Sequence, residues 1–337
     1  MFLSHFADYQ LNRNLKHLIV HVTNHCNFRC KHCFIDFSPK RDLPLEKYQA
    51  LGKEVGKMFW LDIGGGEPFL RKDLVEICAA FNAEVITIPT NGFLTDRVVE
   101  MTKRLTQTVK SEITISLSID GLKETHDRIR EAGSWDKLWV TYEKLREIPN
   151  VRVKINTVLC KENFTEILPL MEQVYERRPD FHSIILLRGN PMDASYGLPP
   201  LEELKKIQEP LFHILGKYDY GHKSFTSRVL RNYHRYLWNT SLATIEQKTQ
   251  VIPCLAGKAH AVVMGNGDVS SCEMLPPIGN IKDKTWTQIW NGPAMEAQRK
   301  FIRDKKCHCT HNCAMLDSIL YRPQSYPSLI GGVELAR

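Results

Sequence analysis

Three cysteines stand close together near the amino terminus of this 337-residue chain. Three residues separate Cys26 from Cys30 and two separate Cys30 from Cys33, and the apolar run 17–22 directly precedes them. Cysteine thiolates are the usual ligands of iron–sulfur clusters, and a cubane [4Fe–4S] cluster normally takes four of them. A loop that supplies three thiolates therefore leaves one iron open to a substrate or cofactor. This open iron is what makes catalysis possible.

A second group of cysteines occupies the last quarter of the chain. It consists of Cys254, Cys272, Cys307, Cys309 and Cys313. The sequence Gly-Asn-Gly-Asp at residues 265–268 predicts a β-hairpin that folds Cys272 back beside Cys254. Because His308 and His311 lie among these cysteines, a tetrahedral zinc site is the alternative to an iron–sulfur cluster. Colour separates the two, since an iron–sulfur protein is brown and a zinc protein is colourless.

The two remaining cysteines, Cys78 and Cys160, fall in a helix-like and a strand-like context, and we expect them to be buried core residues. A disulfide framework belongs to short secreted chains, and residues 1–10 lack the charged start and apolar core of a signal peptide. No window approaches the roughly 18 consecutive apolar residues that a membrane span needs. We therefore expect a cytoplasmic protein with no transmembrane segment.

The charge of the chain gives little sign of a nucleic-acid partner. The net charge is +7, and no block of Lys and Arg interleaved with aromatic residues stands out. A modest basic excess can attract a phosphorylated or carboxylated substrate, but we favour a solvated surface without a special partner.

Short apolar runs alternate with longer amphipathic segments over roughly the first half of the chain. Strands are predicted at residues 17–23, 58–63, 84–89, 112–118, 151–158 and 181–187. Helices are predicted between them at residues 45–57, 72–80, 97–105, 135–146 and 164–177. Six βα units predict an α/β fold in which a parallel sheet curls into a partial (β/α)6 TIM-type barrel. Active sites in such sheets lie where strands end and helices begin.

Polar and glycine-rich motifs follow the second, third and fourth predicted strands. Gly65 and Gly66 lack Cβ atoms and let the backbone approach a ligand, while Glu67 can accept hydrogen bonds from an ammonium group. Ser118 and Asp120 are two residues apart on a strand and so on one face, where they offer a hydroxyl and a carboxylate to vicinal ribose hydroxyls. Each motif alone is compatible with a plain turn. Together they predict one site at one rim of the barrel.

The cysteine spacing, together with the motif Gly65-Gly66-Glu67-Pro68, resembles the signature of the radical S-adenosylmethionine (SAM) enzymes. In that family SAM occupies the open iron through its amino and carboxylate groups, and a Gly-Gly-Glu-Pro motif holds the amino group. The segment that ends in Arg130 resembles one whose arginine pairs with the SAM carboxylate, with a solvated helix start as the alternative. His32 replaces the aromatic residue that usually precedes the third cysteine, so the adenine contact stays open. The resemblance implies SAM-binding roles for Gly65, Gly66, Glu67, Asn91, Ser118, Asp120, Arg130 and Asn156.

The second cysteine group resembles the SPASM and twitch subdomains that follow some radical SAM barrels. The resemblance rests on Cys254 and Cys272 with a glycine between them, followed after a gap by the other three cysteines. These subdomains bind auxiliary [4Fe–4S] clusters, and five cysteines in place of the usual seven imply one auxiliary cluster. We expect Cys254, Cys272, Cys309 and Cys313 to be its ligands, because a three-residue spacer reaches two irons of one cluster more comfortably than the single residue after Cys307.

These patterns divide the chain into four parts. The barrel is expected over residues 1–195, connecting helices over 196–250, the auxiliary-cluster domain over 251–320 and a tail over 321–337. Within the second part, residues 224–247 predict a helix rich in arginine and aromatic residues. We expect this helix to cap the barrel mouth with its arginines in water; contact with an anionic substrate or a lipid surface is the alternative.

The resemblance implies that the chain cleaves SAM reductively and abstracts hydrogen from a substrate with the 5′-deoxyadenosyl radical, using a reductant such as flavodoxin or ferredoxin. Fewer than twenty residues precede the first strand, so a leader-binding domain of the peptide-modifying relatives would be a separate protein. We therefore expect a small-molecule substrate, such as a sugar, an aminoglycoside or a glycan or lipid precursor, that is oxidised, epimerised or rearranged.

Two alternatives stay open at this point: a peptide maturase with a separate leader-binding partner, and a non-catalytic iron–sulfur electron carrier. A related enzyme of molybdenum-cofactor synthesis ends on a glycine pair. Here five residues follow Gly331-Gly332, so that particular match fails.

Overall fold

The structure is a computed structural model that describes residues 2–38, 41–220 and 224–332. Its centre is a parallel sheet whose first six strands lie in chain order, each paired with the next. These strands are β1 (His17–Thr23), β2 (Lys57–Gly65), β3 (Asn82–Thr90), β4 (Glu112–Ser118), β5 (Val151–Leu159) and β6 (Phe181–Leu186). The predicted six-stranded partial barrel is confirmed.

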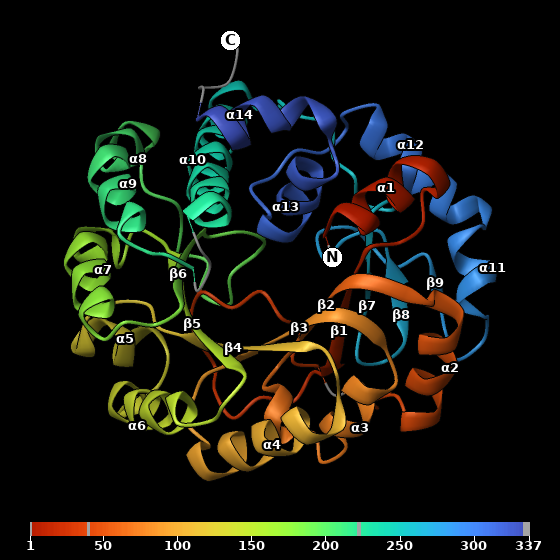
Figure 1. Ribbon diagram of the computed structural model, residues 1–337, viewed down its shortest axis with the longest axis horizontal. Coiled ribbons are helices and arrows are strands. Elements are labelled where there is room, and N and C mark those ends of the chain that lie inside the picture. Colours follow the sequence, from red (N-terminus) through yellow and green to blue (C-terminus); the bar gives the residue numbers. More distant parts are fainter. Residues whose placement is uncertain (1, 39–40, 221–223, 333–337) are drawn as a thin grey trace.

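Helices between the strands cover the outside of the barrel (Figure 1). They are α2 (Leu45–Val55), η1 (Pro68–Leu70), α3 (Leu74–Ala79), α4 (Thr95–Thr108), α5 (Lys123–Ile129), α6 (Ser134–Arg146), η2 (Phe164–Glu166) and α7 (Ile167–Glu176). Alternate strand residues such as Leu18, Val20 and Leu61 belong to the large apolar core beneath these helices. Because side chains alternate along a strand, the residues between them face the barrel interior. Cys78 and Cys160 are fully buried, as expected of core residues.

The carboxyl-terminal part of the chain extends the same sheet. Strand β7 (His260–Val263) pairs in parallel with β1, and the short antiparallel strands β8 (Asp268–Ser270) and β9 (Gly279–Asn280) follow it. The predicted hairpin is present, since the Gly267 N–H donates to the Met264 carbonyl at 2.8 Å between β7 and β8. The sheet therefore runs without a break from the barrel into the segment that carries the second cysteine group.

Further helices complete the ring on the open side of the strands (Figure 1). They are α1 (Phe2–Asn12), α8 (Leu201–Lys206), α9 (Gln208–Gly216), α10 (Ser224–Gln247), α11 (Trp286–Trp290), α12 (Pro293–Arg303), α13 (Asn312–Leu320), η3 (Pro323–Ser325) and α14 (Tyr326–Gly331). Helix α10 buries Tyr233, Tyr236 and Trp238 and packs against α8, α9, α13 and α14. Arg235 is exposed, whereas Arg231 is half-buried and donates to the Tyr218 carbonyl at 3.1 Å, so the expected position over the barrel mouth stays a prediction. The expected tail is helical at its start, where α14 packs against α10; residues 333–337 lie outside the described residues.

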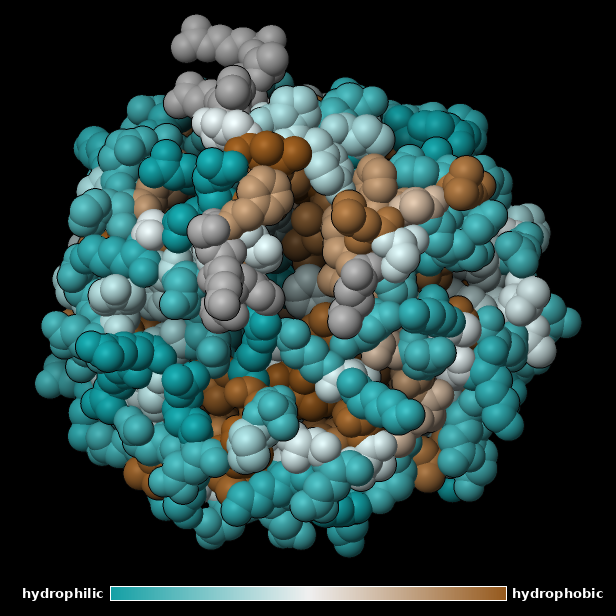
Figure 2. Space-filling model, viewed as in Figure 1, coloured by the Kyte–Doolittle hydropathy of each residue, from teal (hydrophilic) through white to brown (hydrophobic). Residues whose placement is uncertain are grey.

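The surface in the view of Figure 2 is mainly hydrophilic, and hydrophobic residues gather in the hollow near its centre. Within the described ranges, no helix combines the length and the apolar character needed to cross a bilayer. This finding agrees with the expectation from the hydropathy pattern.

Candidate active site

The three-cysteine loop follows β1 at the carboxyl end of the strand. Cys30 is buried, and Cys26 and Cys33 are half-buried. The Cys33 N–H donates to the Cys30 carbonyl at 3.0 Å, and the Met192 N–H holds the loop by donating to the Cys33 carbonyl at 2.8 Å. Burial raises the pKa of the Cys26 thiol to about 11, so binding of a cluster must displace thiol protons. Three thiols on one fixed loop fit a [4Fe–4S] cluster with one open iron.

The glycine motif after β2 is packed directly against the base of this loop. The Gly66 N–H donates to the Thr23 carbonyl at 2.8 Å, and the Glu67 N–H donates to the His25 carbonyl at 2.9 Å. A Cβ atom on Gly65 would lie 2.2 Å from the Thr23 carbonyl oxygen, and Gly65 has a φ of +106°. The missing side chains thus allow backbone to meet backbone, whereas the sequence suggested close approach to a ligand. The motif and the cysteine loop form one rigid unit.

Glu67 braces the ends of β2 and β3. Its carboxylate accepts hydrogen bonds from the Phe69 N–H at 3.2 Å, the Thr90 hydroxyl at 2.9 Å and the Asn91 N–H at 2.9 Å. Burial raises the pKa of Glu67 to about 7, because these hydrogen bonds only partly offset the loss of water. Within the described residues Glu67 has no ion-pair partner, so the charge of an ammonium group would complement it. Its predicted role towards SAM remains a prediction.

Asn91 connects this carboxylate to the cysteine loop. Its side-chain amide donates to Asn27 Oδ1 at 2.9 Å, and Asn27 lies between Cys26 and Cys30. The predicted site residues Glu67 and Asn91 are therefore brought together with the cysteine loop by direct contacts.

The contacts of Asp120 favour a different role from the expected one, which stays a prediction. Asp120 lies beyond the last residue of β4, so the alternation that placed it on one face with Ser118 does not apply. It is fully buried, and its carboxylate accepts hydrogen bonds from Arg130 Nε at 2.6 Å, His32 Nε2 at 2.7 Å and the Val158 N–H at 2.7 Å. These contacts engage both carboxylate oxygens within the protein, which favours a positioning role over contact with a ribose. Burial opposes ionisation, but Arg130 and His32 hold the pKa of Asp120 well below its usual value.

Arg130 lies beside the cysteine loop, as its predicted role requires. Its Nη1 approaches the Cys30 thiol at 3.8 Å while Nε is held by Asp120. The side chain is 9% exposed, so Asp120 fixes a buried guanidinium next to the cluster ligands. Asp120 therefore acts as a positioning residue for Arg130.

The remaining predicted SAM contacts lie on the barrel wall. Ser118 of β4 and Asn156 of β5 are register partners. Asn156 Oδ1 is buried and has no hydrogen-bond partner in the described part of the chain. An unsatisfied buried acceptor indicates a missing donor, which a bound molecule can supply.

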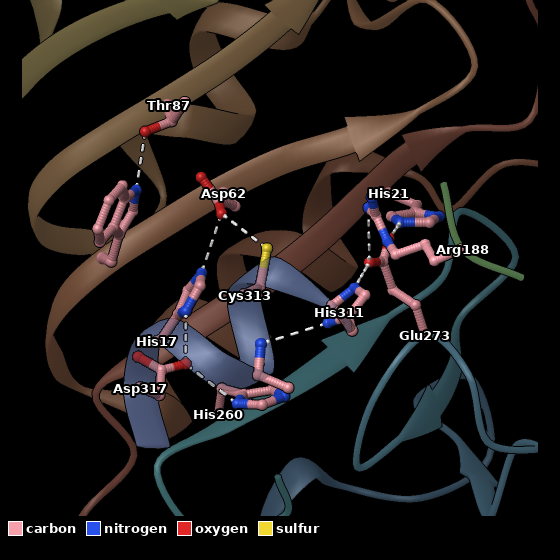
Figure 3. Close-up of polar contacts among 12 residues, drawn as sticks. His17, His21, Asp62, Thr87, Arg188, His260, Glu273, His311, Cys313 and Asp317 are labelled. Carbon is pink, nitrogen blue, oxygen red and sulfur yellow. Dashed lines mark hydrogen bonds and ion pairs between the residues drawn. The ribbon is translucent and has the colours of Figure 1, made fainter. Parts of the chain in front are cut away.

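Sequence reasoning missed a chain of buried polar groups that spans the barrel interior (Figure 3). His17 of β1 contacts Asp317 of α13 at 2.8 Å and Asp62 of β2 at 3.1 Å. Asp317 also pairs with His260 of β7 at 3.0 Å. Burial opposes protonation of His17, but the two carboxylates outweigh it and raise the pKa of His17 to about 10. The only sequence signal was a histidine or aspartate inside otherwise apolar strands, as at His17, Asp62 and His260.

A second polar group in Figure 3 centres on Glu273. This carboxylate accepts hydrogen bonds from His21 at 2.7 Å and from His311, and it pairs with Arg188 at 3.7 Å. Burial raises the pKa of both the Cys33 and the Cys309 thiols, and the Arg188 guanidinium partly opposes this rise at each. Arg188 thus lies close enough to both cysteine groups to act on each.

Cys307, which the expected ligand set leaves out, lies with Cys254 and Cys272, whereas Cys313 of the expected set makes a different contact. Cys254 and Cys307 pack around the buried Cys272 in one cluster. Burial raises the pKa of the Cys254 thiol to about 12, and the thiols of Cys309 and Cys307 act in the same direction. Cys313, by contrast, lies in the first turn of α13 and donates to Asp62 Oδ2 at 3.6 Å (Figure 3). The start of this helix turns Cys313 towards the barrel interior, away from the other four.

Comparisons with known proteins agree with this arrangement. A family model described as the radical SAM superfamily matches residues 20–174, and a model described as the SPASM iron–sulfur cluster-binding domain matches residues 241–314. The three-cysteine loop falls within the first match and the second cysteine group within the second.

Curated relatives resemble mainly the barrel. A GTP 3′,8-cyclase of Helicobacter pylori strain HPAG1 is 37% identical over 184 residues, which cover 50% of this chain and 54% of that protein. An Fe-coproporphyrin III synthase of Methanosarcina barkeri is 29% identical over 201 residues, which cover 54% of this chain and 48% of that protein. The chain thus spans about half the length of the curated relatives it matches.

Solved structures share the fold over most of the chain. SuiB of Streptococcus suis, bound to the precursor peptide SuiA, matches with a TM-score of 0.63 at 18% identity, covering 89% of this chain and 70% of that one. The protein anSMEcpe with bound AdoMet matches with a TM-score of 0.60 at 19% identity, covering 94% of this chain and 96% of that one. At these identities the likeness concerns the fold.

Proposed function

The chain belongs to the radical SAM superfamily and carries a carboxyl-terminal SPASM domain, and from this membership we propose that it generates a 5′-deoxyadenosyl radical from SAM to abstract hydrogen from a small-molecule substrate. The substrates that we favour are sugars, aminoglycosides and glycan or lipid precursors. The outcome would be oxidation, epimerisation or rearrangement. A reductant such as flavodoxin or ferredoxin would supply the electron.

The chain's own residues divide the work of binding. Cys26, Cys30 and Cys33 would hold the first cluster, which together with SAM supplies the radical chemistry when bound. The backbone unit of Gly66 and the cysteine loop fixes where SAM would lie relative to the thiols. Glu67 offers a buried negative charge to the SAM ammonium group. These residues bind and orient, and the surrounding barrel excludes water from a reactive radical.

The methionine carboxylate and the ribose have separate candidate partners. Arg130, fixed by Asp120 beside Cys30, can pair with the carboxylate. Ser118 and Asn156 face the interior on neighbouring strands and can reach ribose or substrate hydroxyls. Asp120 holds Arg130 in this arrangement without a contact of its own to SAM.

The polar interior of the barrel is the observation that favours a polar small molecule as the substrate. TIM-type barrels are normally filled by layers of bulky branched side chains. Here inward positions of two neighbouring strands hold Ser116, Lys154 and Asn156. Ser116 Oγ and Asn156 Oδ1 are buried without a hydrogen-bond partner among the described residues, which costs free energy. A substrate with hydroxyl and charged groups would satisfy these side chains. An apolar substrate would not.

The second cysteine group supports one auxiliary cluster. Cys254, Cys272, Cys307 and Cys309 provide four thiols within one buried region, which matches the number that a fully ligated [4Fe–4S] cluster takes. A cluster without an open iron suits electron transfer from a substrate radical or structural support better than direct substrate binding.

A peptide substrate is the second candidate, because SuiB and anSMEcpe, which share this fold, have been solved with bound peptides. Deuterium transfer into 5′-deoxyadenosine distinguishes a small-molecule substrate from a peptide substrate. Anaerobic protein, dithionite and SAM would be incubated with extract of cells grown on deuterated medium, separated into a small-molecule filtrate and a peptide fraction. Deuterium in 5′-deoxyadenosine is expected with the filtrate. Deuterium transfer from the peptide fraction alone would replace the small molecule with a peptide.

Formation of 5′-deoxyadenosine without substrate tests the chemistry itself. Protein reconstituted with iron and sulfide should release 5′-deoxyadenosine and methionine on reduction with dithionite in the presence of SAM. The triple variant Cys26→Ala, Cys30→Ala, Cys33→Ala should release none. Cys78→Ala is the matched control, because it removes a buried thiol from the core beneath the helices. A wild-type protein that binds the first cluster yet leaves SAM intact would refute the proposal.

A further inference from the structure

Three residues on the β4–β5 wall of the barrel form a binding subsite, and we infer that Lys154, Ser116 and Asn156 hold an oxyanion of the substrate together with a neighbouring hydroxyl or amino group. The inference rests on the proposed function, since it names the substrate class of the same barrel interior. The ligand would be a hydroxylated or aminated carboxylate or phosphate.

Strand register places the three residues side by side. Ser116 is the β4 partner of Lys154, and Ser118 is the partner of Asn156 two positions further along β5. The alternate residues Val153 and Ile155 belong to the apolar core beneath the helices. Because side chains alternate along a strand, Lys154 and Asn156 face the barrel interior. The same alternation on β4 turns Ser116 inward.

None of the three polar groups has a hydrogen-bond or ion-pair partner among the residues that the structure describes. Ser116 is fully buried and its hydroxyl makes no hydrogen bond to a described residue, and the buried Asn156 Oδ1 is in the same condition. Lys154 likewise makes no hydrogen bond or ion pair with any residue of the described ranges. Leaving a buried polar group unsatisfied costs about 1–3 kcal/mol. Two such groups, Ser116 Oγ and Asn156 Oδ1, lie on one small patch with the half-buried Lys154, and together they indicate a polar ligand that completes them.

The charged groups near Lys154 favour an anionic ligand. The ring of His234 of α10 lies 4.4 Å from that of Phe181, the β6 register partner of Lys154. Burial, assisted by Lys154, lowers the pKa of His234 to about 3, so this ring is neutral and leaves Lys154 as the positive charge at this patch. Burial lowers the pKa of Lys154, and the carboxylate of Asp62 opposes this from a distance, but that carboxylate is hydrogen-bonded to His17 at 3.1 Å.

The hydrogen-bonding groups define the rest of the ligand. The Lys154 ammonium only donates, and the Ser116 hydroxyl can donate beside it, so both suit the oxygens of a carboxylate or phosphate. Asn156 Oδ1 only accepts, and it therefore needs a hydroxyl or amino hydrogen on the same ligand. Carboxylate and phosphate share this chemistry, and binding measurements can separate them.

Binding of defined probes to the anaerobically reconstituted protein with SAM tests the subsite. We would use gluconate, glucose 6-phosphate and neutral glucose in isothermal titration calorimetry. At least one anionic probe should bind about tenfold or more tightly than glucose, because a hydrogen bond to a charged group is stronger than a neutral one. Lys154→Met should remove this advantage, and Lys154→Arg should keep most of it. Lys161→Met, on the exposed surface, is the matched control.

A measurement on the wild-type protein covers the case in which Lys154→Met does not fold. Bound anion should protect Lys154, but not Lys161, from acetylation by acetic anhydride, read by mass spectrometry of the digested protein. Protection by gluconate alone assigns a carboxylate and protection by glucose 6-phosphate alone assigns a phosphate. Anionic probes that bind no better than glucose and leave Lys154 equally reactive would overturn the subsite.

Release of 5′-deoxyadenosine by the wild-type protein is measured in parallel. If SAM is cleaved and the anions do not bind, the subsite is wrong and the radical chemistry stands. If SAM is not cleaved, the proposed function fails whatever the anions do.

Discussion

Gly66 and His25 meet backbone to backbone, and a Cβ atom on Gly66 would lie 2.1 Å from the His25 carbonyl oxygen. No side chain fits this distance, and the neighbouring atom is backbone that cannot move away alone. The contact fixes the glycine motif against the start of the cysteine loop. It explains physically why a glycine stands one residue before the buried carboxylate of Glu67.

Gly66→Ala should therefore displace the cysteine loop. Overpacking of this kind costs typically about 1–3 kcal/mol, and we expect lower stability together with an about tenfold or greater fall in 5′-deoxyadenosine formation. Anaerobic urea unfolding and the SAM cleavage assay measure the two effects. Gly216→Ala is the control, since nothing lies within 4 Å of a Cβ atom there and α9 is helical. Equal SAM cleavage by Gly66→Ala and wild type would contradict the role of this contact.

Glu67 should make SAM binding dependent on pH. With its pKa raised to about 7 by burial, Glu67 is ionised above that pH and neutral below it. Because an ammonium group pairs only with the ionised form, the KM for SAM should rise as the pH falls below about 7. Glu67→Gln should raise the KM by about tenfold and abolish this dependence. The exposed Glu100→Gln is the control, and a pH profile shared by wild type and Glu67→Gln would rule out an ionic role.

The second cysteine group should hold iron through Cys307 and not through Cys313. In a background without Cys26, Cys30 and Cys33, iron and sulfide content and visible absorbance report this group alone. Adding Cys307→Ala should remove most of the remaining iron, because a fully ligated cluster loses one of its four thiolates. Adding Cys313→Ala should leave it in place. The reverse result would restore the ligand set expected from the cysteine spacing.

The buried His17 should make stability fall at alkaline pH. Its pKa of about 10 in the folded chain lies above the 6.5 of an unperturbed histidine, so its contribution is complete below 6.5 and is lost as the pH rises towards 10. The urea midpoint of the wild type should therefore decrease over this range. His17→Gln should be less stable by about 3–5 kcal/mol at neutral pH, because removal of one partner leaves buried carboxylates unpaired.

The difference between His17→Gln and wild type should shrink towards pH 10. The exposed His213→Gln serves as the control, because His213 lies on the outer surface of α9. A constant difference from neutral to alkaline pH would show that His17 is not protonated in the folded protein.

Local patterns in the sequence determined the elements and the first metal site. The six predicted strands match β1 to β6 to within about two residues, because apolar periodicity and flanking turn residues are local properties. The spacing of Cys26, Cys30 and Cys33 placed three thiols on one loop without any knowledge of the fold. Glu67 and Asn91 were found because each follows a strand, and parallel strands bring their carboxyl ends to one edge.

Tertiary structure alone decided which of these groups meet. The pairing of Asp120 with Arg130 depends on how the chain turns after β4, and the pairing of β7 with β1 joins segments over 200 residues apart. Cys313 turns inward because α13 begins one residue before it, a boundary that cysteine spacing does not encode. The register of β5 with β4 and β6 decides which residues lie beside Lys154, and the local sequence does not show this register. Contacts between distant segments depend on packing of the whole chain, and local sequence does not specify them.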